Sequence, residues 1–145
     1  MSVAELPLKI EAIIYTIKDG SIEYLLIKRT PEDGGFWQPV TGTVHDGERL
    51  VDCLTREIQE ETGITKIDNV SDCLYRFDWQ RKSGERLLEF VYAVKVPADS
   101  KIILAPDEHE DYKWCSFNEA LDTLCTDNNK KSFEVINQHL VDHAA

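Results

Sequence analysis

Residues 42–64 read GTVHDGERLVDCLTREIQEETGI, and this stretch carries the clearest pattern of the chain. Within it, Arg49–Thr62 has the composition of a helix, and Gly63 stands where helices commonly end. The expected buried face of this helix is a stripe of apolar residues: Val51, Leu54 and Ile58. The sequence therefore predicts one well-defined helix that is closed by a glycine.

Three carboxylates lie close together on the same predicted helix. At 3.6 residues per turn, Glu57, Glu60 and Glu61 fall within an arc of about 100° beside the apolar stripe. Like charges at this spacing repel one another and weaken a helix, so the chain needs something that compensates for them. Arg56 can neutralise one carboxylate, and a divalent cation could neutralise the others. Hard oxygen ligands select Mg²⁺ or Mn²⁺ over zinc.

An acidic helix face has a simpler explanation, which is that it is solvated, because surface exposure is the ordinary state of glutamate. The surrounding spacing argues against that explanation here. Gly42 is followed after five residues by Glu48 and, after seven more, by the run REIQEETGI at residues 56–64. This pattern resembles the Nudix box of the Nudix hydrolases at every position.

The resemblance implies a fold and an activity. The fold would be an α+β sandwich of the Nudix α/β/α type with a mixed sheet, formed by residues 1–145 as a single domain. The activity would be metal-dependent hydrolysis of a nucleoside diphosphate that is linked to another group. The residues that would bind Mg²⁺ are on the helix: Glu57, Glu60 and Glu61. Arg56 and Glu48 would orient them, and the carbonyl of Gly42 would reach the metal, although turns alone also favour glycine.

The segment before the box indicates which branch of the Nudix hydrolases the chain resembles. Residues 36–42 read FWQPVTG, which is similar to the branch that contains the dihydroneopterin triphosphate pyrophosphatases and dATP pyrophosphohydrolases. Asymmetric diadenosine tetraphosphate hydrolases carry a lysine where this chain has Thr41. Trp37 is expected either to line a base pocket or to pack in the core.

A second segment, EHEDYKW at residues 108–114, is similar to one shared by both branches. In that setting Glu108 would face the metals, as a ligand or as the general base for water. His109 is expected to be a packing residue, because Mg²⁺ prefers oxygen ligands. Three further residues, from the pterin branch, are expected to contact the substrate: Arg29, Thr41 and Lys9.

The composition of the chain argues against some classes of binding partner. The chain has 145 residues and a formal net charge of -11, which argues against duplex nucleic acid and anionic membrane surfaces. We expect a small nucleotide-like substrate and a monomer or homodimer. Four cysteines lack any CxxC or zinc spacing, and we expect mostly buried, reduced thiols. No signal pattern or long apolar run is present, so a soluble, cytoplasmic protein is expected.

Hydrophobic periodicity and turn residues give the remaining elements. The expected strands are residues 8–17, 23–29, 36–44, 66–80, 85–96 and 112–116, with a possible short strand at 102–104. Two more helices are expected at 118–124 and 132–143. The predicted reaction is Mg²⁺-dependent release of pyrophosphate from a nucleoside or pterin triphosphate. The alternatives are a dinucleoside tetraphosphate hydrolase and a nucleotide-binding sensor without catalysis.

Overall fold

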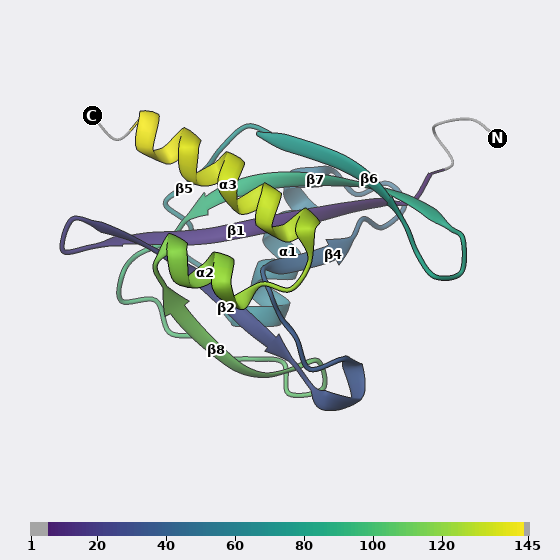
Figure 1. Cartoon of the computed structure of the whole chain (residues 1–145), viewed down its shortest axis with the longest axis horizontal. Coiled ribbons are helices and arrows are strands. Elements are labelled where there is room, and N and C mark those ends of the chain that lie inside the picture. Colours follow the sequence, from purple (N-terminus) through teal and green to yellow (C-terminus); the bar gives the residue numbers. More distant parts are fainter. Residues whose placement is uncertain (1–5, 144–145) are drawn as a thin grey trace.

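Strand β1 (Leu8–Lys18) runs through the centre of a mixed sheet, in a computed structural model that describes residues 6–143. It pairs in parallel with β7 (Arg86–Lys95) along most of its length. Its first half also pairs with β4 (Val40–Thr43), and its second half pairs with β2 (Ser21–Arg29). β1 therefore holds the two halves of the sheet together (Figure 1).

The remaining strands extend this sheet on both sides. β3 (Trp37–Gln38) and β8 (His109–Cys115) pair with β2, while β5 (Asn69–Val70) and β6 (Tyr75–Gln80) pair with β7. A short 3₁₀ turn, η2 (Pro31–Asp33), follows β2.

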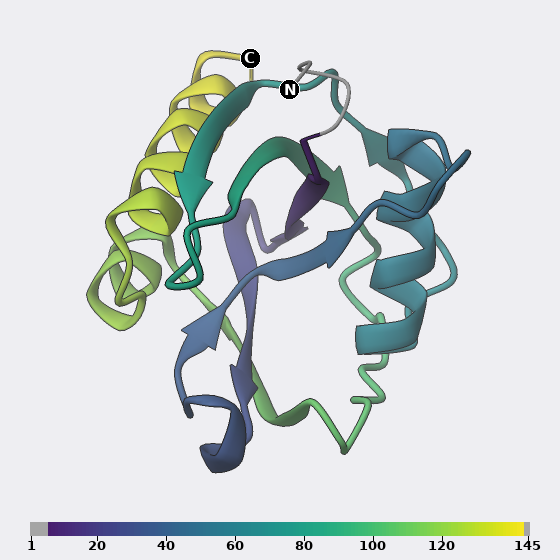
Figure 2. The same ribbon diagram turned by 90° about the vertical axis from the view of Figure 1, so that its right-hand side faces the viewer.

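Helices cover both faces of the sheet, as Figure 2 shows. α1 (Leu50–Thr62) lies on one face, and α2 (Phe117–Thr123) and α3 (Asp127–Asp142) lie on the other. Two apolar cores result because alternate side chains of β1 point to opposite faces. Ile10, Ala12 and Ile14 pack beneath α1, and Ile13 and Tyr15 pack beneath α2 and α3. The predicted α+β sandwich with a mixed sheet is confirmed.

The helix of the quoted stretch is present, with one change to its buried face. Gly63 ends α1 at a φ of 73°, and its N–H donates to the carbonyl of Gln59. This left-handed conformation explains the glycine. The prediction that Val51 belongs to the buried stripe was wrong, since 48% of this residue is exposed. Cys53, fully buried beside Leu54 and Ile58, takes that place.

Three predicted strands differ from the structure. Residues 66–80 do not form one strand, because irregular backbone at 71–74 separates β5 from β6. Residues 36–44 are split at Pro39, which lacks the N–H that a sheet ladder requires. Residues 102–104 form no strand; the N–H of Ile103 instead donates to the carbonyl of Thr62.

Two elements begin three or more residues earlier than predicted. β8 starts at His109 rather than Tyr112, because its pairing with β2 continues past a bulge to Arg29. α3 starts at Asp127 rather than Ser132. The side chain of Thr126 accepts a hydrogen bond from the N–H of Asn129, which is a helix cap that the sequence does contain.

None of the described helices combines the length and apolar character needed to cross a bilayer. The four thiols are free, and Cys53 and Cys115 are buried, as expected. Cys73 and Cys125 are exposed, so the expectation of mostly buried thiols holds for only half of them.

Candidate active site

Arg56 joins helix α1 to the loop before it. Its guanidinium donates to both carboxylate oxygens of Glu48, at 2.8 and 3.1 Å, and to Oε1 of Glu57 at 2.6 Å. It also donates to the carbonyl of Thr43 and to Glu60, each at 3.2 Å. The hydrogen bonds from Arg56 lower the pKa of Glu48 to about 2, so this pair is ionised at neutral pH. Arg56 thereby fixes the position of Glu57.

Glu57 lies directly against the backbone of Gly42 in β4. A Cβ atom at Gly42 would lie 2.2 Å from both Cγ and Cδ of Glu57, so no side chain fits there. Gly42 pairs with Ile10 inside a strand and is not a turn residue. The requirement for glycine therefore comes from the approach of Glu57.

A cavity of about 320 Å³ opens between β1, β4, α1 and the loop before β8, and we call it the acidic cavity. Its lining residues are Lys9, Arg29, Thr41, Gly42, Thr43, His45, Glu57, Glu61, Glu108 and His109. Eight of these residues lie outside the helix, on separate parts of the chain, and the fold brings them together.

Glu61 is the most deeply placed carboxylate of the acidic cavity. Only 5% of this residue is exposed, and its Oε2 has no hydrogen-bond partner among the residues that the structure describes. Burial, with the neighbouring charges of Glu57 and Glu108, raises the pKa of Glu61 to about 9. A buried carboxylate without a partner is costly, so the protein alone does not satisfy this group.

His109 forms the wall behind Glu61. Its Nε2 lies 3.1 Å from Nε2 of Gln38, whose amide donates to it. Burial lowers the pKa of His109 to about 4, so the ring is neutral and its proton is on Nδ1. Nδ1 is 3.9 Å from Oε1 of Glu61. The expectation that His109 is a packing residue agrees with its burial. Its contact with Gln38 was not predictable from the sequence, because the two residues are far apart along the chain.

The residues of the acidic cavity suit a divalent cation that prefers oxygen ligands. Ligand atoms of Glu61, Glu108 and His109 lie within 4.8 Å of one another, and Glu57 lines the same cavity. The partnerless Oε2 of Glu61 is the clearest sign of fit, because a bound ion would satisfy it.

Two cations stand beside these carboxylates. Lys9 and Arg29 both line the acidic cavity, and their charges oppose the rise in the pKa of Glu61. The Arg29 side chain is held by Asp33, by Oε1 of Gln38 at 3.3 Å and by the ring of Phe36. An ordered arginine of this kind suits a phosphate group.

A second cavity of about 260 Å³ adjoins the first, and we call it the aromatic cavity. It shares Lys9, Arg29 and Thr41 with the acidic cavity. Its other lining residues are Phe36, Gln38, Phe77, Trp79, Glu89, Thr126, Asn128 and Asn129. A planar ring attached to a phosphate chain could therefore occupy the two cavities together.

The sequence matches the model of the family described as "NUDIX domain" over residues 7–138. The chain belongs to the NUDIX domain family. Four residues of its Nudix box contact one another in the structure: Gly42 contacts Glu57, and Arg56 donates hydrogen bonds to Glu48 and Glu57.

Curated relatives of this Nudix protein have differing names. It is 36% identical to the octanoyltransferase of Myxococcus xanthus over 101 residues, which are 69% of this chain and 28% of that protein. It is 29% identical to the dihydroneopterin triphosphate diphosphatase of Escherichia coli K12, covering 74% and 77% of the two chains. It is 31% identical to the asymmetrical bis(5'-nucleosyl)-tetraphosphatase of Rattus norvegicus, covering 74% of each. The chain spans less than a third of the first two curated relatives that it matches.

Solved structures agree with the Nudix fold. The Ap4A hydrolase of Caenorhabditis elegans, in a binary complex, superposes with a TM-score of 0.81 at 24% identity, covering 94% of this chain and 99% of that one. The dihydroneopterin triphosphate pyrophosphohydrolase of E. coli gives a TM-score of 0.75 at 25% identity, covering 90% and 95%.

The predicted site residues are not all gathered in the two cavities. Glu60 does not line the acidic cavity; 58% of its side chain is exposed and it contacts Arg56. Its assignment as a metal ligand remains a prediction.

Trp37 does not line the aromatic cavity but packs against the core beneath α2 and α3, with Lys113 over its ring. Of the two expectations for Trp37, the structure agrees with core packing.

The aromatic cavity contains residues that the sequence analysis missed. Phe77 and Trp79 come from β6, Glu89 comes from β7, and Asn128 and Asn129 begin α3. The alternation of Phe77 and Trp79 in a strand was the one available signal, since it places both rings on the same face.

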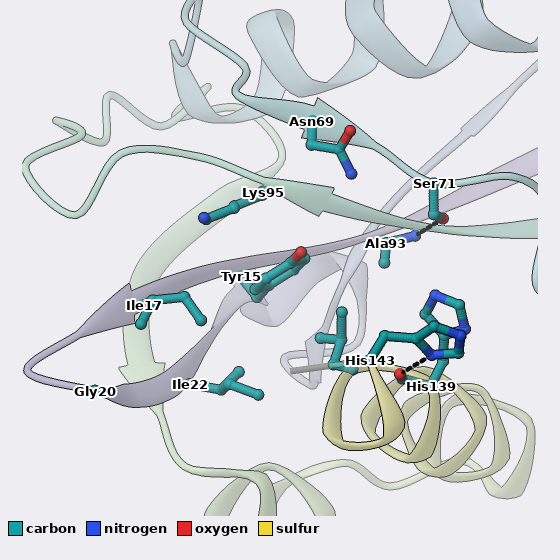
Figure 3. Close-up of a pocket in the computed structure, with 11 residues that line it drawn as sticks. Tyr15, Ile17, Gly20, Ile22, Asn69, Ser71, Ala93, Lys95, His139 and His143 are labelled. Carbon is teal, nitrogen blue, oxygen red and sulfur yellow. Dashed lines mark hydrogen bonds between the residues drawn. The ribbon is translucent and has the colours of Figure 1, made fainter. Parts of the chain in front are cut away.

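A further cavity of about 490 Å³ lies toward the other end of β1 (Figure 3). Tyr15, Lys95 and the stacked rings of His139 and His143 line it. It shares no residue with the acidic or aromatic cavity. The Nudix box therefore does not contribute to it.

Proposed function

We propose that this Nudix protein hydrolyses a phosphoanhydride bond in a nucleoside triphosphate or a pterin triphosphate, releasing pyrophosphate and leaving a monophosphate. The observation that carries this proposal is the continuity of the two cavities through Lys9, Arg29 and Thr41. One cavity offers carboxylates for a metal ion, and the other offers aromatic rings for a base. The dihydroneopterin triphosphate diphosphatase relative supports the same class of substrate.

The proposed cofactor is Mg²⁺ or Mn²⁺. Glu57, Glu61 and Glu108 would hold it, with Glu60 and the carbonyl of Gly42 as further candidates. When bound, such an ion supplies positive charge against the phosphate oxygens and acts as a Lewis acid. Arg56 keeps Glu57 in place, and Glu48 keeps Arg56 in place.

Glu108 is the proposed general base. It is exposed on the loop before β8, and its backbone carbonyl accepts a hydrogen bond from Thr30 at 3.2 Å. This contact holds the loop against η2. In the proposed step, Glu108 takes the proton of a water whose oxygen bonds to phosphorus while the bond to the leaving pyrophosphate breaks.

Lys9, Arg29 and Thr41 are the proposed phosphate-binding residues. Arg29 can hold two oxygens at once, because Gln38 and Asp33 already fix its orientation. The buried, neutral His109 keeps water away from the inner side of Glu61.

A dinucleoside tetraphosphate hydrolase is the second candidate, and the rat relative at 31% identity favours it. Its products would be a nucleoside triphosphate and a monophosphate, so the products separate the two functions. A cytoplasmic protein acting as monomer or homodimer on a small molecule remains our expectation.

The test is a panel of substrates with Mg²⁺: the nucleoside triphosphates, dihydroneopterin triphosphate and diadenosine tetraphosphate, with products identified by chromatography. Pyrophosphate and a monophosphate are expected from at least one triphosphate. A triphosphate product from the dinucleotide alone would favour the second candidate. Tight binding of a ligand without turnover would leave only a nucleotide-binding sensor.

A further inference from the structure

Two buried carboxyl groups lie beneath the aromatic cavity, and the proposed hydrolysis uses neither. Glu11 on β1 is fully buried, and Glu89 on the adjacent β7 is 4% exposed and lines the cavity. β1 and β7 run parallel, with Lys9 opposite Glu89. Residues two apart share a face, so Lys9, Glu11 and Glu89 all point toward the α3 side of the sheet.

The two carboxyl groups are held by neighbouring side chains. Oε1 of Glu89 accepts a hydrogen bond from the indole Nε1 of Trp79 at 3.0 Å. Oε1 of Glu11 accepts one from Nδ2 of Asn129, at the start of α3, at 3.2 Å. Oε2 of Glu11 is buried and has no partner among the residues that the structure describes. An unpaired carboxylate oxygen at this depth is destabilising.

A proton on Glu11 resolves this problem. Burial, together with the adjacent carboxyl group of Glu89, raises the pKa of Glu11 well above its usual value. A protonated Glu11 can donate to the adjacent carboxyl group of Glu89, so that the two groups no longer face each other as acceptors only.

The position of Glu89 relates it to a bound ring. Phe77 and Trp79 line the same cavity from β6, and Phe36 lines it from the loop before β3. Lys9, Arg29 and Thr41 connect this cavity to the acidic cavity, where a phosphate chain is proposed to lie. A ring stacked on these aromatic side chains would present its edge to Glu89.

We propose that Glu89, supported by Glu11 and Trp79, selects rings whose edge offers two adjacent N–H donors. The 2-amino-4-oxo-pyrimidine edge shared by guanine and the pterins has this arrangement. A carboxylate only accepts hydrogen bonds, so it matches two donors side by side. Adenine presents an acceptor next to its amino group and leaves one carboxylate oxygen facing a lone pair. The inference rests on the proposed function, because it assigns the ring of that substrate.

Binding of phosphate-free compounds to the metal-free protein tests this edge recognition separately from hydrolysis. Calorimetry with guanosine, 7,8-dihydroneopterin, inosine and adenosine is expected to show the first two bound about 10- to 100-fold tighter than adenosine. Inosine lacks the 2-amino group, and its affinity should lie between those of guanosine and adenosine. Guanosine and dihydroneopterin distinguish the two sources of the shared edge.

Glu89→Gln is the decisive variant, because the amide of glutamine donates at one of the two positions where the carboxylate accepts. We expect the ratio of guanosine affinity to adenosine affinity to fall to about threefold or less. Glu11→Gln should keep most of the preference, since its amide donates as the protonated carboxyl group does. Trp79→Phe keeps the ring but frees Oε1 of Glu89, and should reduce the preference partly. Thermal unfolding of each variant checks its fold.

The outcomes separate the two proposals. Equal binding of adenosine and guanosine by the wild-type protein overturns the edge recognition, even if triphosphates are hydrolysed. A folded Glu89→Gln protein with undiminished preference overturns it as well. Discrimination between the nucleosides without hydrolysis of any triphosphate would overturn the proposed function and leave the edge recognition standing.

Discussion

Cδ of Glu57 lies 2.2 Å from the point where a Cβ atom at Gly42 would stand. The strand and the helix are therefore packed so closely that the carboxylate occupies the side-chain position of the strand residue. Arg56 also donates a hydrogen bond of 2.6 Å to Oε1 of Glu57, and a displacement of Glu57 would break it.

Gly42→Ala should displace Glu57. We expect a loss of about 1–3 kcal/mol in the free energy of unfolding from overpacking, and a reduction of about 10- to 100-fold in Mg²⁺ affinity or turnover. Gly20→Ala is the control, since Gly20 has a φ of 81° and, its chain neighbours aside, no described residue has an atom within 4 Å of its Cβ position. That variant should lose stability only. Wild-type metal affinity in Gly42→Ala would contradict the role of this contact.

Glu61→Gln should abolish turnover and leave the fold intact. The amide keeps the shape of the side chain but removes the buried charge that a metal ion needs, and we expect a loss of at least about 10³-fold in kcat. Steady-state kinetics with Mg²⁺ and circular dichroism measure the two effects. Glu110→Gln is the matched control, because Glu110 is exposed and, among residues 6–143, forms an ion pair only with Lys28. Full activity in Glu61→Gln would rule out the proposed metal site.

The stability of the metal-free protein should depend on Glu61 and pH. Burial, with the charges of Glu57 and Glu108, raises the folded-state pKa from 4.5 to about 9. The folded state then holds this proton more tightly than the unfolded state. The stability contributed by protonated Glu61 is complete below pH 4.5 and is lost as the pH rises through about 9.

Denaturant unfolding of metal-free wild type and Glu61→Gln across this range tests that dependence. The variant should become the more stable of the two as the pH rises, by more than about 1 kcal/mol near the upper end. Adding Mg²⁺ should restore the wild type most strongly at high pH, because binding displaces the proton. Glu134→Gln, which changes an exposed carboxylate on α3, should leave the pH profile unchanged. Parallel profiles for wild type and Glu61→Gln would argue against the buried proton.

Arg56→Lys should weaken the junction between α1 and the preceding loop. Lysine keeps the charge but cannot reach Glu48, Glu57 and the Thr43 carbonyl together, so we expect a loss of about 1–3 kcal/mol in unfolding free energy. Arg49→Lys is the control, because the Arg49 side chain is 83% exposed and its one ion-pair partner within the described part of the chain is Asp52. Its effect should be below about 0.5 kcal/mol. Equal effects of the two substitutions would contradict the structural role of Arg56.

The sequence pattern was sufficient to predict the site residues that lie close together in one segment of the chain. Gly42, Glu48, Arg56 and Glu57 stand at fixed intervals, and the structure brings all four into contact. The termination of α1 at Gly63 was also predictable, because a left-handed residue is a local requirement. Strand boundaries were less accurate at residues 66–80 and 109–111, where pairing with another strand decides the ends.

The sequence by itself determined the central helix, the glycine that closes it and the acidic residues that it carries, because short-range geometry governs all three. Only the tertiary structure decided that Glu61 is buried while Glu60 is exposed, that Trp37 joins the core, and that Glu89 and Glu11 meet beneath Trp79. These outcomes depend on which strands become neighbours in the sheet and on where α3 crosses it. Burial and charge pairing between distant segments leave no periodic signal along the chain.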